Sequence, residues 1–356
     1  MFGALPKLFD RSFFIGYFLP ASLLFSGVVG NLIAFVDLGP KFWDFLVQKS
    51  TFGVAVSIVI IWLISIFLMA ITRPLIRFLE GYGRHNPLSL FQDQHVRIFK
   101  GEIEPLLGTF KNVMDTRINA MPAPSSGVNR GKLRAAVTNY PEREGLVLPT
   151  RLGNIMRAYE RYSDIVYGIE SIVMWPRLLM VVPEAARDRI REGESLFHFA
   201  LNILFVGTIT FLLFVGLSAE SLYENHSLAA IQSFLWPAIC VPLISVFFGW
   251  LGWWLLPIAA MQRGEQVKSI FDLYRAPLAE ALGLQLPATD AEERKMWQLV
   301  SRRMELRASD YRLLDYRKGL SEFRRKSDIP STKDKEKTGQ VDSKEDEKEQ
   351  ADALFS

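Results

Sequence analysis

The sequence predicts an all-α membrane protein with two transmembrane helical hairpins, four spans in all. A helical cytosolic insert separates the hairpins, and a cytosolic C-terminal helical region follows them. Three observations lead to this fold class. Four long stretches lack charged residues and are long enough for membrane helices, which need about 20 apolar residues each. The basic residues gather on one side of those stretches, and the segments between them follow the spacing of amphipathic helices.

The composition agrees with a protein that is partly membrane and partly soluble. Hydrophobic residues make up 49% of the 356 residues, a share between a soluble globular protein and a pure bundle of membrane helices. Lysine and arginine number 41 against 38 acidic residues, a balance that argues against a nucleic-acid partner. The single cysteine, Cys240, excludes an intrachain disulfide and a cysteine-based metal site.

The first part of the chain is expected to form a short interfacial helix over residues 1–11 and a transmembrane hairpin over residues 12–79. The charge-free run 12–36 is too long for the core of a secretory signal and lacks a small-residue cleavage pattern, so we interpret it as an uncleaved span. The second span is the charge-free run 50–72, whose helix is expected to continue past its first arginines.

Within the first span, Ser22, Ser26 and Gly30 recur every four residues. Such a ladder of small residues lets two helices approach closely in lipid. Its partner is expected to be the second span of the same chain. A contact between two subunits is the alternative.

Residues 80–194 are predicted to be the cytosolic helical insert. Thr150 is a candidate N-cap for a helix whose apolar side chains share one face, leaving several polar side chains for other partners. The apolar face is Leu152, Ile155, Met156 and Tyr159, and the polar residues are Arg151, Asn154, Arg157 and Arg161. Pro183 then opens a helix that is expected to run without a break into the third span, with Gly193 as its hinge.

Residues 195–262 are predicted to be the second transmembrane hairpin. Its fourth helix carries Pro237, Pro242 and Pro257, which predict a kink. Trp250, Trp253 and Trp254 are typical of an interfacial belt, and a ligand-stacking cage is the weaker alternative.

Residues 263–326 are predicted to be the cytosolic C-terminal helices, and residues 327–356 a disordered charged tail. A separate helix is expected from Gln266 to Leu282. Thr289 and Glu292 then form a capping-box pattern that introduces the next helix. Its apolar stripe, at near-heptad spacing, is expected to dock on the insert or to self-associate as a coiled coil; the stripe is Trp297, Val300, Met304, Tyr311 and Leu314.

The distribution of basic residues predicts the orientation in the membrane. Of the 41 basic residues, 39 lie in the N-terminal segment, in residues 73–194 or after residue 262, whereas the two short connections hold only Lys41 and Lys49. Both termini and the insert are therefore expected in the cytosol, and the protein in the plasma (inner) membrane as a multi-pass protein.

Arginines in the insert are the candidate ligand-binding residues. They are interleaved with glutamates and aspartates, so salt-bridged helix faces are the simpler explanation. The alternative is an anion pocket with tyrosine and tryptophan rims, built from Arg151, Arg157, Arg161 and Arg177.

No motif in the sequence predicts an enzyme, a cofactor or a metal site. The four histidines, His85, His95, His198 and His226, are not at metal-ligand spacing, and no phosphate loop or nucleophile elbow occurs. The spans carry no Asp, Glu, Lys or Arg between their ends, which argues against an ion-coupled transporter. A pore lined by Ser, Thr, Asn31 or Asn202 from several subunits stays open.

Three stretches of the insert, LPTRLGN (148–154), RYSDIVYG (161–168) and WPRL (175–178), resemble segments of bacterial, often actinobacterial, four-span membrane proteins. The resemblance implies the topology described above and brings no known activity or site residues. In topology alone, the chain is also similar to flagellar stator subunits and bestrophin-type channels, although it carries no motif of either family.

These observations leave two function classes. The first is a homo-oligomeric channel or pore-type membrane effector gated by its cytosolic helical domain. The second is a non-conducting membrane scaffold that recruits a cytosolic protein partner. Both imply the lipid bilayer as a partner, and the first also implies self-association.

Overall fold

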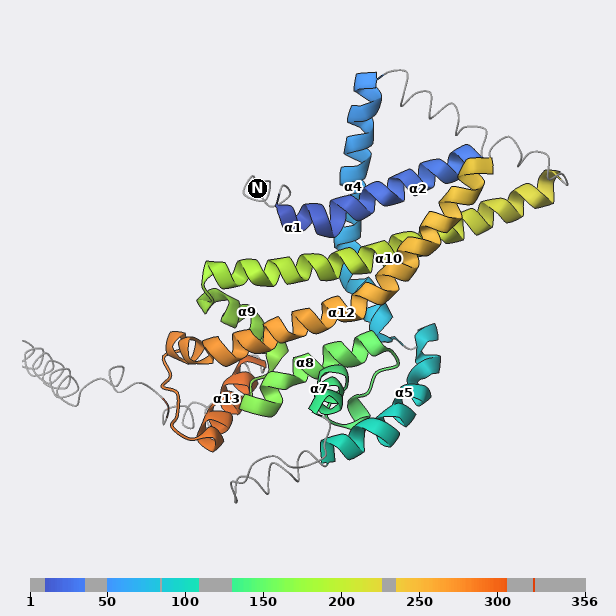
Figure 1. The fold of residues 1–356 in the computed structure, drawn as a ribbon. Coiled ribbons are helices and arrows are strands. Elements are labelled where there is room, and N and C mark those ends of the chain that lie inside the picture. Colours follow the sequence, from blue (N-terminus) through green and yellow to red (C-terminus); the bar gives the residue numbers. More distant parts are fainter. Residues whose placement is uncertain are drawn as a thin grey trace, which may run out of the picture. The chain divides into compact units, whose positions relative to one another are not determined.

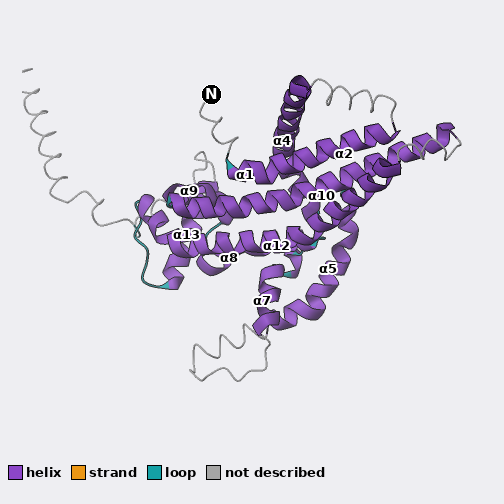
Figure 2. Cartoon of the chain, turned by 45° about the horizontal axis from the view of Figure 1, so that its top comes forward, coloured by secondary structure: helices purple, strands orange, loops and turns teal. Residues whose placement is uncertain are grey.

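A computed structural model describes residues 10–35, 50–83, 85–108, 130–225 and 235–305 together with Phe323. In these ranges the chain forms helices joined by turns, without a β-strand (Figures 1 and 2). Four helices are long and apolar enough to cross a membrane: Arg11–Phe35, Phe52–Glu80, Glu184–Glu220 and Ile239–Ala281. The all-helical class and the four candidate spans are thus confirmed. The first connection, residues 37–49, and the charged tail lie outside the described residues, as do nine residues of the N-terminal segment. The second connection, expected at residues 220–224, is instead helical and belongs to the helix Glu184–Asn225.

The first candidate span consists of α1 (Arg11–Phe13), a π-helical segment η3 (Phe14–Phe18) and α2 (Leu19–Phe35). It packs against α4 (Ser50–Glu80) and α10 (Glu184–Asn225). The core between these helices holds Phe13, Tyr17, Ala21, Leu68 and Val206, all buried. Most of the apolar surface of α4 stays uncovered by this chain, as expected for a helix that faces lipid or another subunit.

The second span continues beyond its first arginines, as predicted, and ends in a Schellman motif. Gly81 adopts a left-handed φ of 91°, and the amides of Gly81 and Tyr82 donate to the carbonyls of Phe78 and Arg77. Glycine suits this position because it carries no Cβ, and here a Cβ would also collide with the ring of Pro149. The end of α4 therefore packs against the loop that contains Pro149.

Several short helices follow α4. They are η4 (Pro87–Phe91), α5 (Gln92–Ile98), η5 (Phe99–Ile103), α7 (Arg130–Asn139) and η6 (Glu144–Leu146). Their small core is formed by Phe99, Ile103, Ala136 and Val147. Residues 109–129, which include the proline-containing segment PAPSSG (122–127), lie outside the described residues.

Helix α8 (Arg151–Tyr167) confirms the predicted face, because Leu152, Ile155, Met156 and Tyr159 are all buried. The Thr150 hydroxyl accepts from the Gly153 amide at 2.9 Å, as an N-cap does. One expectation was wrong: Asn154 is not left for other partners. It is fully buried, and its amide group exchanges hydrogen bonds with the backbone of Leu148 at 2.7 and 2.8 Å.

Helix α10 runs unbroken through Gly193, which confirms the expected continuous helix. Helix α12 (Leu235–Ala281) corrects the expectation of a separate helix from Gln266 to Leu282. Its four prolines do not divide it. Gly264 lies inside α12, where the close approach of Tyr159 favours glycine, because a Cβ there would lie 2.8 Å from Tyr159 Cδ1.

The chain divides into two compact units, Met1–Arg161 with Pro183–Ser269, and Tyr162–Val182 with Ile270–Ser356. Two of the boundaries between these units fall inside α8 and α12, and they differ from the domain boundaries that the sequence predicts at residues 80, 195 and 263. Those domain boundaries stay predictions. The second unit contains α9 (Ser171–Val181) and α13 (Asp290–Glu305). Its buried side chains include Met174, Leu178, Phe271, Trp297 and Val300.

The start of α13 confirms the predicted cap. The Glu292 amide donates to the Thr289 hydroxyl at 3.4 Å, and the Glu293 amide donates to the Thr289 carbonyl. Of the predicted stripe, Trp297 and Val300 are buried, whereas Tyr311 and Leu314 lie outside the described residues. Met304, the third described residue of the stripe, is half-buried. The contact of α13 with α9 agrees with docking of the described part of the stripe on the insert.

Candidate functional site

The first compact unit brings polar residues together where the apolar parts of α10 and α12 begin. Glu194 is the last charged residue before the uncharged run of α10, and Arg263 is the first after the uncharged run of α12. We call the residues that meet here the junction cluster: Tyr159, Gly193, Glu194, Arg263, Gly264 and Gln266. They come from α8, α10 and α12, which in this unit lie against one another.

Gly193 provides a close contact between α10 and α12. It is buried, and a Cβ at this position would collide with the Gln266 side chain, lying 2.8 Å from its Cδ. The Gln266 amide group donates to the Arg189 carbonyl at 3.3 Å, one turn earlier on α10. The glycine predicted as a hinge therefore packs against α12, and helix α10 continues through it without interruption.

An ion pair joins the same two helices one residue further along. Arg263 Nη2 lies 3.1 Å from Glu194 Oε1, and both side chains are mostly covered. The guanidinium also lies over the Phe197 ring, 5.3 Å from its centroid. Partial burial strengthens such a pair relative to an exposed one, because water screens it less. The pair fixes the register of α10 on α12 at the edge of their apolar parts.

Tyr159 connects α8 to this contact. Its ring packs on Gly264, and burial raises the pKa of its hydroxyl to about 12. The phenol therefore stays neutral at physiological pH, so it contributes packing and supplies no acid or base.

The end of α4 contacts the same α8. A Cβ at Gly153 would lie 2.7 Å from the Glu80 carbonyl oxygen, and the Glu80 side chain is 7% exposed. Arg157 donates to the Tyr82 hydroxyl, and its guanidinium lies 5.7 Å from the Tyr82 ring centroid. Helix α8 thus contacts two of the candidate spans, α4 at Gly153 and α12 at Gly264, and α12 in turn contacts α10 through the ion pair.

The arginines of the predicted anion pocket have different surroundings. Arg161 pairs with Glu142 at 3.0 Å, and Arg157 lies 4.0 Å from Glu160, in addition to its contact with Tyr82. Arg177, in the second compact unit, donates to the Val173 carbonyl. Arg151 is exposed and lines an apolar pocket. The salt bridges of Arg157 and Arg161 follow the simpler expectation, and the anion pocket stays a prediction.

The predicted ladder residues divide between two surroundings. Ser22 and Ser26 donate to carbonyls of their own helix, and Ser26 is exposed. Gly30 instead faces α12, where a Cβ would lie 2.8 Å from Val241 Cγ2. Close approach of α2 to α10 uses another glycine, Gly27, where a Cβ would lie 2.6 Å from Thr210 Cγ2.

The two asparagines considered as pore-lining residues are fully buried inside one chain. Asn202 donates to the Gly16 carbonyl at 2.8 Å, and Asn31 donates to the Gly27 carbonyl at 3.0 Å and the Thr210 carbonyl at 3.4 Å. They attach the first span to α10. A pore formed between several subunits would therefore have to be lined by other side chains.

Sequence reasoning missed Gln266 and the pairing of Glu194 with Arg263. The signal for the pair was present, since these are the charges that border two uncharged runs at the ends that the sequence predicts to lie on the same side of the membrane. Among the described residues, no group of three or more His, Cys, Asp or Glu is placed to hold a metal ion. Comparisons with protein-family models, curated proteins and solved structures give no match.

Proposed function

We propose that the chain is an integral plasma (inner) membrane protein that forms a homo-oligomeric channel or pore-type effector gated by its cytosolic helices. Its four apolar helices would form two hairpins, with both termini and the insert in the cytosol. The one-sided distribution of basic residues supports this orientation.

The observation that carries the gating proposal is the unbroken course of α10. Its first residues, from Glu184, are charged and lie outside the uncharged run, and the helix then continues into that run without a break. A helix transmits a displacement along its axis because its hydrogen-bonded backbone is stiff. At the junction cluster, α10 is also tied to α12 by Glu194 and Arg263, so a movement of one helix acts on the other.

Self-association is supported by the surface of α2. Ser26 is exposed on an otherwise apolar helix, and a small residue there lets a second helix approach closely in lipid. On α4, large apolar side chains such as Phe52, Leu63 and Phe67 are more than half exposed. Lipid or neighbouring subunits would cover them.

The test is the conductance of the purified full chain in planar bilayers, in the parent protein and in Gly193→Pro. Proline removes a backbone donor and breaks the helix at the boundary between its charged and apolar parts, at a cost of about 3 kcal/mol for the helix. We expect conductance in the parent and its loss in the variant, with membrane insertion and oligomer size retained.

A matched control places proline at a position of the same helix where it does not interrupt the helix. Glu184 is the first residue of α10, and proline is favoured at the first position of a helix because the amide there has no partner. Glu184→Pro should keep the parent conductance. Full conductance in Gly193→Pro would mean that α10 does not transmit gating, and a parent that never conducts would reject the channel.

A non-conducting scaffold is the second candidate, and exposed apolar side chains in the second compact unit favour it. Ile172 and Met180 of α9 are 68% and 82% exposed, and Leu273 of α12 is 69% exposed. Apolar side chains of this size on a cytosolic surface are typical of a protein-binding site. Replacing all three by serine should abolish the binding of a cytosolic partner that the parent protein captures.

A further inference from the structure

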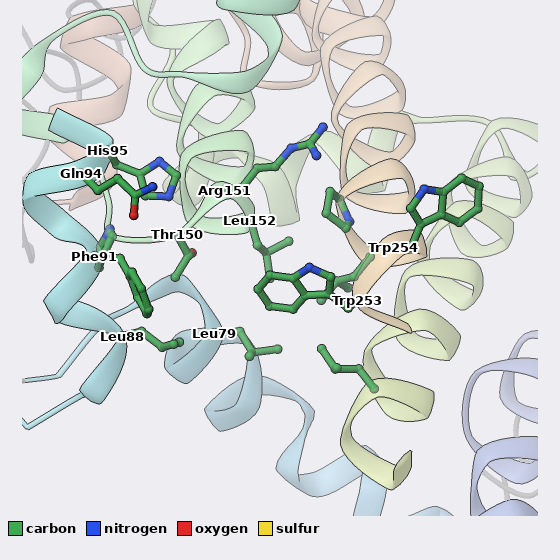
Figure 3. Close-up of a pocket in the computed structure, with 14 residues that line it drawn as sticks. Leu79, Leu88, Phe91, Gln94, His95, Thr150, Arg151, Leu152, Trp253 and Trp254 are labelled. Atoms are coloured by element: carbon green, nitrogen blue, oxygen red, sulfur yellow. The ribbon is translucent and has the colours of Figure 1, made fainter. Parts of the chain in front are cut away.

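An apolar pocket of about 310 Å³ lies in the first compact unit, apart from the junction cluster. Its walls come from the end of α4, from η4 and α5, from the start of α8, and from α10 and α12 (Figure 3). Apolar side chains form most of the lining, among them Leu79, Leu88, Phe91, Leu204 and Trp253.

The lining residues indicate where the pocket lies along the membrane normal. Leu204 and Trp253 belong to the uncharged runs of α10 and α12, whereas Gln94, His95 and Arg151 belong to polar segments outside those runs. The pocket therefore spans the boundary between the apolar and the polar parts of the unit. At such a boundary a bilayer places its headgroups and the first part of its acyl chains.

The pocket is open towards the surface that would face lipid. Trp253 and Trp254 line it and are still 67% and 55% exposed. On the opposite side, Phe91 lines it with 50% exposure, next to Leu90 at 82%. Large apolar side chains exposed on both sides of a pocket give an acyl chain a continuous apolar route from the bilayer.

Arg151 supplies the charge at the polar end. In Figure 3 its guanidinium extends past Leu152, away from Phe91 and Leu88. Among the described residues, no hydrogen bond or ion pair engages this guanidinium, whereas Arg157 and Arg161 of the same helix have protein partners. The neighbouring His95 shares a hydrogen bond with Tyr140 at 3.1 Å, and desolvation lowers its pKa, so it adds no positive charge at neutral pH.

We propose that this pocket binds an anionic phospholipid of the cytosolic leaflet, with an acyl chain between Leu79, Leu88 and Trp253 and the headgroup against Arg151. The apolar lining would contact the acyl chain, and the guanidinium of Arg151 would pair with the negative charge of the headgroup. The lipid would fill a cavity between α12 and the elements that precede α8. The proposal requires a membrane-embedded protein but does not depend on conductance.

The test uses tryptophan fluorescence of the full chain in phosphatidylcholine vesicles that contain brominated lipid. Bromine quenches tryptophans that it touches, so Trp253 and Trp254 report on an acyl chain in the pocket. Brominated phosphatidylglycerol should quench at a lower mole fraction than brominated phosphatidylcholine with the same chains. We expect a preference of roughly fivefold, which is the effect of one basic residue near an anionic surface.

Two variants assign the preference to the pocket. Arg151→Gln should abolish it, and because Arg151 is exposed the fold should be kept. Arg97→Gln removes an exposed arginine of α5 that does not line the pocket and should keep the preference. The double variant Trp253→Phe/Trp254→Phe should remove the preferential part of the quenching.

Three outcomes would overturn the proposal. Equal quenching by the two brominated lipids would mean that only bulk lipid contacts these tryptophans. A preference that survives Arg151→Gln, or one lost equally in Arg97→Gln, would mean general attraction to the surface charge. A preference that remains without Trp253 and Trp254 would place the bound lipid elsewhere on the chain.

Discussion

At the scale of single residues, the closest approach between the apolar parts of α10 and α12 depends on glycines. A Cβ at Gly207 would meet the backbone of α12, colliding with the Gly249 amide and lying 2.6 Å from the Ser245 carbonyl oxygen. Backbone atoms have no rotamers with which to move aside. A Cβ at Gly216, further along α10, would meet no other helix of the described chain within 4 Å.

These two glycines allow a paired prediction. Gly207→Ala should separate α10 from α12 and lower the thermal stability in detergent, by about 1–3 kcal/mol as for overpacking elsewhere. Gly216→Ala should leave the stability unchanged or raise it, since alanine favours a helix over glycine by about 1 kcal/mol. Thermal unfolding followed by circular dichroism measures both. Equal melting temperatures would show that the two helices do not touch at Gly207.

The residue scale also shows what spacing alone predicts. The ladder Ser22, Ser26, Gly30 follows from its four-residue period, yet Gly30 faces α12 whereas the hydroxyls of Ser22 and Ser26 bond to their own helix. Gly27, one residue off the ladder, makes the close approach to Thr210. A helix that is apolar on all sides gives no pattern that separates a face against lipid from a face against protein, so the period identifies small residues but not their partners.

At the scale of elements, α13 is held in the second compact unit by one buried carboxylate. Glu293 accepts from Arg275 Nε at 2.9 Å and from the indole N–H of Trp297 at 3.2 Å. Arg275 also lies over the Tyr167 ring, 4.5 Å from its centroid. The contact thus joins α13 to the ends of α8 and α12 within this unit.

The corresponding prediction is that Glu293→Gln loosens α13. The neutral amide keeps the shape but loses the charge that Arg275 faces, and the partly covered guanidinium is then left without its carboxylate. We expect the free energy of unfolding to fall by about 1.5–3 kcal/mol, the range for hydrogen bonds to charged groups. Hydrogen exchange of residues 290–305 should accelerate accordingly. Glu292→Gln, on an exposed neighbour, is the control, and equal exchange in both variants would show that the carboxylate does not hold α13.

Among the elements, α10 was predictable and α12 was not, for a physical reason. Helix α10 has a proline before its first turn and no proline inside, only the glycines Gly193, Gly207 and Gly216, so local propensity indicates one helix. Helix α12 contains Pro257, Gly264 and Pro277, which locally favour interruptions. Its contacts with α8 and α10, such as Tyr159 on Gly264, join residues far apart in the chain, which sequence spacing does not reveal.

At the scale of the whole molecule, the number of candidate spans followed from the sequence because hydropathy and length are local properties. The junction cluster did not, because it joins residues from three helices that are far apart in the chain. Charges that border uncharged runs identify Glu194 and Arg263 as boundary residues, but their mutual contact requires the packing of α10 on α12.

The last prediction concerns the membrane topology on which the lipid site and the gating proposal both depend. Reporter fusions after Glu80, Ser126 and Ser327 should all read cytosolic, and a fusion after Gly39 should read external, because the basic residues near span ends lie on one side. Alkaline phosphatase, active only outside, and a fluorescent protein, active inside, give opposite signals at each site. An external signal at Ser126 would place the insert outside the cytosol. Arg151 would then face the outer leaflet, and the charged start of α10 would have no cytosolic trigger to transmit.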